Sequence, residues 1–118
     1  MKYLKEEPLR DRRGNEVKVQ LDNEEKLLTP GLFIYLMAES YTPSPQILVL
    51  NNGDRRRLDK IEDQLDGEPN SKGCFEFEDT DWLLIKKIFD VWVPYVPFLS
   101  KHSSHMEDAL TEAKDKLE

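Results

Sequence analysis

Residues 75–99, FEFEDTDWLLIKKIFDVWVPYVPFL, restrict the possible folds of this chain more than any other segment. Phe75 and Phe77 alternate with glutamates, which predicts a short strand with one buried face. Apolar side chains then cover most of the circumference of a predicted helix, which Pro94 ends. A helix with so narrow a polar stripe is expected at the centre of a fold, with the rest of the chain packed around it.

Residues that cap helices predict where the helices begin. Thr29 precedes Pro30, and proline is favoured in the first turn of a helix. Ser104 and Glu107 have the spacing of a capping box, in which each side chain bonds to the backbone of the other residue. The expected caps are Thr29, Asp54, Asp79 or Thr80, and Ser104.

The N-terminal third is predicted to be extended. Apolar and polar residues alternate over residues 17–21, which is the period of a half-buried strand. Residues 11–15 have the composition of a turn, in which Gly14 can adopt positive φ. We therefore expect residues 3–10 to pair with residues 17–21 in a hairpin.

These signals predict an α+β fold, helix-rich, with about four helices and a small antiparallel β-sheet. We expect residues 1–118 to form a single domain, because no internal repeat or low-complexity linker divides the chain. Within it, residues 1–28 are mainly extended, and residues 29–116 are helix-rich with a short strand near 74–78.

Charge and cysteine content limit the possible functions. The net charge of −7 disfavours sequence-independent binding to nucleic acid or to an anionic membrane. The apolar run from Leu32 to Ala38 is far shorter than a membrane-spanning helix. A single cysteine, Cys74, allows no intramolecular disulfide, and no signal peptide is recognisable. We expect a soluble, cytoplasmic protein that binds neither nucleic acid nor membrane.

Residues suited to catalysis are few, so we expect no enzyme activity and no cofactor. Cys74 lies among carboxylates, which disfavour a reactive thiolate. The glycines are scattered singly and form no phosphate-binding loop. His102, His105 and Glu107 leave one alternative open, a metal-dependent enzyme, because imidazole and carboxylate groups are zinc ligands.

Aromatic residues and prolines are concentrated where the chain leaves the apolar helix. Such a segment either closes the core or exposes an apolar, aromatic surface of the kind found at protein interfaces. The candidate interaction residues are Trp92, Tyr95, Phe98 and Leu99. We therefore expect a protein-interaction or assembly accessory protein, whose partner the sequence does not identify and which can also self-associate.

An acidic surface supports an alternative of another class. Carboxylates are concentrated over residues 62–81, and such a surface can imitate nucleic acid and inhibit a nucleic-acid-binding protein. Binding through it would be sensitive to salt. The residues concerned are Glu62, Asp63, Asp66, Glu68, Glu76, Glu78, Asp79 and Asp81.

The order of these elements resembles small uncharacterised proteins encoded by tailed phages and prophages. The similarity covers residues 1–115 and rests on a strand pair with a glycine turn followed by three segments, Leu28–Ala38, Arg56–Ile61 and Phe75–Lys87. The resemblance implies a small non-enzymatic accessory or assembly factor that acts in the host cytoplasm, with no catalytic residues to carry over.

Overall fold

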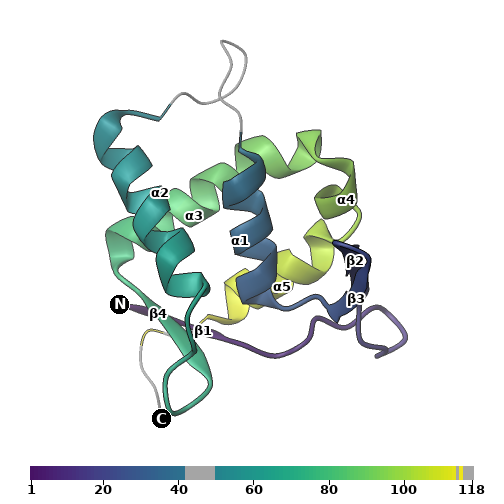
Figure 1. Cartoon of the computed structure of the whole chain (residues 1–118). Coiled ribbons are helices and arrows are strands. Elements are labelled where there is room, and N and C mark those ends of the chain that lie inside the picture. Colours follow the sequence, from purple (N-terminus) through teal and green to yellow (C-terminus); the bar gives the residue numbers. More distant parts are fainter. Residues whose placement is uncertain (42–49, 114, 116–118) are drawn as a thin grey trace.

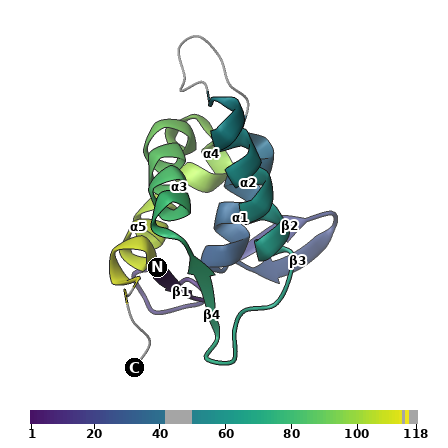
Figure 2. The same cartoon turned by 90° about the vertical axis from the view of Figure 1, so that its left-hand side faces the viewer.

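Helix α1 (Pro30–Ser40) lies in the middle of the protein, and helices α2, α3 and α5 are arranged around it (Figures 1 and 2). The computed structural model describes residues 1–41, 50–113 and 115. Phe33, Ile34 and Met37 of α1 are almost fully buried, and so is Gly31 at its start. Because α1 has apolar side chains on nearly every face, it is stable only when other elements cover it on all sides.

The other helices are α2 (Asn52–Leu65), α3 (Asp79–Trp92), α4 (Pro97–Ser100) and α5 (Ser103–Glu112), with a 3₁₀ turn, η1 (Val93–Tyr95), between α3 and α4. Helix α3 packs against α1 and α2, but Leu83, Lys86, Lys87 and Asp90 give it an exposed face. The central position that the sequence suggested for α3 therefore belongs to α1.

Two separate antiparallel sheets, each of two strands, complete the α+β fold. Strand β1 (Lys2–Lys5) pairs with β4 (Cys74–Phe77), and β2 (Lys18–Leu21) pairs with β3 (Glu24–Leu27). The loop between β2 and β3 consists of Asp22 and Asn23, both at positive φ. This is the geometry of a tight hairpin turn, and aspartate and asparagine tolerate it.

The predicted hairpin between residues 3–10 and 17–21 is therefore wrong in its main pairing. Its turn is confirmed, since Gly14 adopts a φ of 81° and Asp11 accepts hydrogen bonds from backbone amides within the turn. The two flanking segments meet near the turn, through a bridge between Arg10 and Glu16 and through the Val17 amide, which donates to the Leu9 carbonyl at 2.8 Å. Strand β1 instead buries Leu4 opposite Phe75 of β4, a strand distant in sequence.

The N-terminus of α1 is held by two side chains. Thr29 caps the helix as predicted, and its hydroxyl accepts a hydrogen bond from the Leu32 amide at 3.2 Å. Glu6, from the segment after β1, accepts another from the Gly31 amide at 3.1 Å. A Cβ atom on Gly31 would overlap the Glu6 carboxylate and lie only 2.8 Å from the Phe75 ring. Glycine at this position lets the β1–β4 sheet approach the helix.

The other three predicted caps are wrong. Helix α2 is capped by Asn51, whose side chain accepts a hydrogen bond from the Asp54 amide at 2.8 Å. Helices α3 and α5 begin after Glu78 and His102, and neither residue makes a side-chain cap bond. Asp81, in the first turn of α3, does not cap the helix but accepts a hydrogen bond from α2.

The pH dependence of stability tests the burial of the Glu6 carboxyl against α1. The pKa of Glu6 is raised above its ordinary value of 4.5, mainly by burial, although hydrogen bonds from Gly31 and Thr29 lower it. The protonated form thus contributes stability that is fully present below pH 4.5 and is lost as the pH rises through the raised pKa. We expect the free energy of unfolding, relative to Glu6→Gln, to fall as the pH rises from 4.5 through the raised pKa. Urea denaturation of both proteins measures this difference, and a rise over the same interval contradicts the assignment.

Candidate interaction surface

A repeated triplet forms the segment between α3 and α5. Val93-Pro94-Tyr95 is followed by Val96-Pro97-Phe98, so each proline lies between a valine and an aromatic residue. Pro94 lies in the first turn of η1, and Pro97 is the first residue of α4. Since proline fixes φ near its helical value, the repeat favours two consecutive short helical turns.

Side chains at a spacing of three attach this segment to the core. Val93, Val96 and Leu99 are all buried, with exposed fractions of 1%, 7% and 1%. The amide of Val96 donates to the Val93 carbonyl, and the amide of Leu99 donates to the Val96 carbonyl, both at 3.0 Å. Each turn therefore directs one aliphatic side chain inward.

The intervening residues are exposed and apolar or aromatic. Tyr95 is 64% exposed and Phe98 is 42% exposed, and both prolines are exposed as well. We refer to Pro94, Tyr95, Pro97 and Phe98 as the aromatic ridge. Because its prolines limit backbone freedom, the ridge loses little conformational entropy when a partner covers it.

The four candidate residues divide into two pairs. Tyr95 and Phe98 lie together on the ridge, whereas Leu99 is part of the core. Trp92 is partly buried: its indole Nε1 donates to the Ser40 hydroxyl at 3.0 Å, and its ring packs edge-on against Tyr41. Trp92 and Leu99 therefore support the segment from beneath. The two exposed prolines were not among the candidates, although the triplet repeat points to them.

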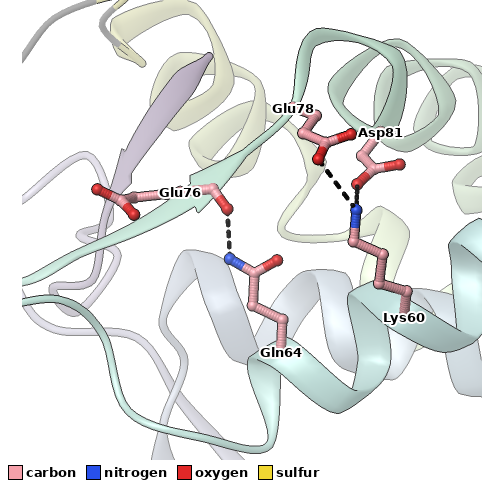
Figure 3. Close-up of polar contacts among 5 residues, drawn as sticks. All are labelled: Lys60, Gln64, Glu76, Glu78 and Asp81. Carbon is pink, nitrogen blue, oxygen red and sulfur yellow. Dashed lines mark hydrogen bonds and ion pairs between the residues drawn. The ribbon is translucent and has the colours of Figure 1, made fainter.

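Part of the predicted acidic surface has a structural role, as Figure 3 shows. Asp81, in the first turn of α3, is only 2% exposed and accepts a hydrogen bond from Lys60 of α2 at 3.0 Å. Glu78 lies 3.5 Å from the same ammonium, and Gln64 donates to the Glu76 carbonyl. These contacts join α2 to β4 and to the start of α3, and the Asp81 bond raises the pKa of Lys60.

The exposed carboxylates gather on α2 and the end of α1. Burial raises the pKa of Glu62, and repulsion from Asp59, Glu39 and Asp63 raises it further. The pKa of Tyr35 is raised first by Glu39, with smaller effects from burial, Asp66 and Glu62. We call this group the acidic face: Glu39, Asp59, Glu62, Asp63 and Asp66. Glu39 was missed because its proximity to Glu62 depends on the packing of α1 against α2. Asp59 lies three residues before Glu62 on the same helix, so its proximity did have a local signal.

The histidines lie near the start of α5. The ring centroids of His102 and His105 are 6.4 Å apart, and burial lowers the pKa of His102. Within residues 1–41, 50–113 and 115, no three His, Cys, Asp or Glu side chains are arranged to hold a metal ion. The geometry therefore gives the metal-dependent alternative no ligand set in this part of the chain.

Comparisons with family models, with curated proteins and with solved structures found no match. Among the helices of the described residues, none combines the length and the hydropathy needed to span a bilayer. Inference about function therefore rests on the surfaces described above.

Replacement of Asp81 tests the contact between α2 and α3. Asp81→Asn removes a buried charge and places an amide opposite the Lys60 ammonium, so we expect the protein to lose about 1–3 kcal/mol of unfolding free energy. Asp79→Asn is the matched control, because Asp79 lies in the same turn but is exposed and pairs with the exposed N-terminal amine. Its expected cost is below about 1 kcal/mol. Equal losses for the two variants, measured by urea denaturation, would rule out a special role for Asp81.

Proposed function

We propose that this protein is a non-enzymatic interaction module that binds a protein partner through the aromatic ridge. The observation that supports the proposal is the outward direction of Tyr95 and Phe98 on a segment whose alternate residues are anchored in the core. The side chains that stability requires are already buried, so the exposed aromatic rings are available for binding.

The chemistry of the ridge favours a protein partner. Tyrosine combines a large apolar ring with a hydroxyl group and is enriched among the residues that dominate binding energies. The ridge is an exposed chain segment that presents side chains outward, which suits contact with another protein surface. An accessory or assembly role, which the resemblance to phage proteins implies, is part of this proposal.

A second candidate function uses the acidic face. Burial is the main cause of the raised pKa of Glu62, but Asp59, Glu39 and Asp63 raise it further, so these carboxylates are close enough to repel one another. Such crowding is a feature of surfaces that imitate nucleic acid. Asp81, Glu78 and Asp79 contribute less to such a surface, because each is close to a cationic group. The proposed imitation of nucleic acid therefore depends on fewer carboxylates than the sequence indicated. It differs from the leading proposal in predicting binding that high salt abolishes.

Removal of the two rings tests the leading proposal. We expect the double variant Tyr95→Ala/Phe98→Ala to remain folded and to bind its partner at least about thirtyfold more weakly, or about 2 kcal/mol. Leu83→Ala is the matched control, because Leu83 is 66% exposed but lies in the first half of α3. Capture of partners from a lysate of the encoding organism, at low and high salt, provides the comparison.

Three results of that experiment have different meanings. Loss of a salt-resistant partner in the double variant alone supports the ridge. Equal capture by all three proteins contradicts it, and equal capture by all three that high salt abolishes favours the acidic face. Circular dichroism and thermal unfolding of the double variant show whether the rings are needed for folding, and a failure to fold would also contradict the proposal.

A further inference from the structure

A small cavity of about 370 Å³ lies between the N-terminal turn and the start of α5. The turn contributes Asp11, Arg12 and Arg13, and the other wall contains Lys101, Ser104 and His105. The cavity thus brings together cationic residues that are far apart in sequence, although the chain as a whole carries a net charge of −7.

The cationic side chains of this cavity are available to a ligand. Asp11 is its only carboxylate lining residue, and one of its oxygens accepts hydrogen bonds from the amides of Arg13 and Asn15 at 2.8 and 3.0 Å. Within the described part of the chain, the side chains of Arg12, Arg13 and Lys101 make no ion pair. All three residues are exposed. Unpaired cations at a concave site attract a negatively charged group.

Lys101 joins the cavity to the nearer end of the aromatic ridge. The amide of Lys101 bonds to the Pro97 carbonyl, so the helical turn of α4 extends to Lys101, three residues after Phe98. Tyr95 lies in the preceding turn, η1, which the extended residue Val96 separates from α4. Residues three apart on a helix lie on neighbouring parts of one face. Lys101 therefore connects the ridge to Arg12 and Arg13 across the cavity.

We propose that the ridge and the basic cavity together bind an acidic peptide segment of a partner protein, with an apolar side chain against Tyr95 and Phe98 and carboxylates beside Arg12, Arg13 and Lys101. This inference rests on the proposed function and adds the chemistry of the partner. Charge also favours the cavity over the acidic face as the site, because the acidic face on α1 and α2 repels the same segment. A long nucleic acid fits less well, because the net charge of −7 on the whole chain disfavours binding of an extended row of phosphates.

A pair of labelled peptides tests this inference. One carries a leucine and a tryptophan followed by a run of glutamates, and the other has glutamine in place of each glutamate. Fluorescence anisotropy with the full chain should show that the glutamate peptide binds at least about tenfold more tightly at low salt. We expect Arg12→Gln/Arg13→Gln to remove this advantage. Arg55→Gln/Arg56→Gln is the matched control, because these arginines are equally exposed but lie on α2, and it should leave the advantage unchanged.

Several results would overturn the inference. They are equal affinity for the two peptides, equal effects of the two arginine pairs, and no binding of either peptide at millimolar concentration. Tighter binding of a single-stranded oligonucleotide through Arg12 and Arg13 would assign the cavity to nucleic acid instead. Partner capture separates the two proposals: capture that is lost in Tyr95→Ala/Phe98→Ala but kept in Arg12→Gln/Arg13→Gln refutes the acidic partner and leaves the ridge in place.

Discussion

The need to cover α1 on every side determines the arrangement of the whole protein. A helix without a continuous polar face gains stability only when apolar side chains from several directions remove it from water. Helices α2, α3 and α5 and strand β1 all contact it. The backbone amides at the N-terminus of α1 also need partners. Thr29 and Glu6 accept hydrogen bonds from amides that would otherwise be buried without them. The close approach at Gly31 then places the β1–β4 sheet against the end of the helix.

The same packing explains how a binding surface can arise next to the core. The segment after α3 must supply apolar side chains to the core, and Val93, Val96 and Leu99 do so at a regular spacing. Proline at the start of each turn keeps the backbone in a narrow range of conformations. The residues between the anchors are thereby held outward, so the exposure of Tyr95 and Phe98 is a consequence of folding and does not require a separate element.

Local signals in the sequence predicted much of the fold. The α+β class, the cap at Thr29, the turn at Gly14 and the strand at residues 74–77 all depend on neighbouring residues, and all are confirmed. The pairing of β1 with β4 was not predictable in this way, because periodicity shows that a segment is a strand but not which distant strand it joins. The hairpin turn at Asp22 and Asn23 did have a local signal, because aspartate and asparagine tolerate the positive φ of a tight turn. The alternation over residues 17–21 was instead interpreted as pairing with the preceding segment.

The candidate surface was predictable only in part, because only some of its features depend on neighbouring residues. Its location followed from the density of aromatic residues, but composition alone did not separate the buried Leu99 from the exposed Phe98. The triplet repeat contained that information, since residues three apart share a face. The basic cavity and the place of Glu39 in the acidic face lay beyond prediction, because each joins side chains from segments that only tertiary packing brings together.

The central claim is that one segment is anchored by its aliphatic residues and presents its aromatic rings to a partner. NMR with a soluble paramagnetic agent measures this exposure ring by ring. In the free protein, the agent should broaden the ring signals of Tyr95 and Phe98 as strongly as the methyl signals of Leu83, while the Val96 and Leu99 methyl signals stay sharp. With the partner bound, the two rings should become protected and Leu83 should not. Rings that are already protected in the free protein, or that stay exposed in the complex, would contradict the account.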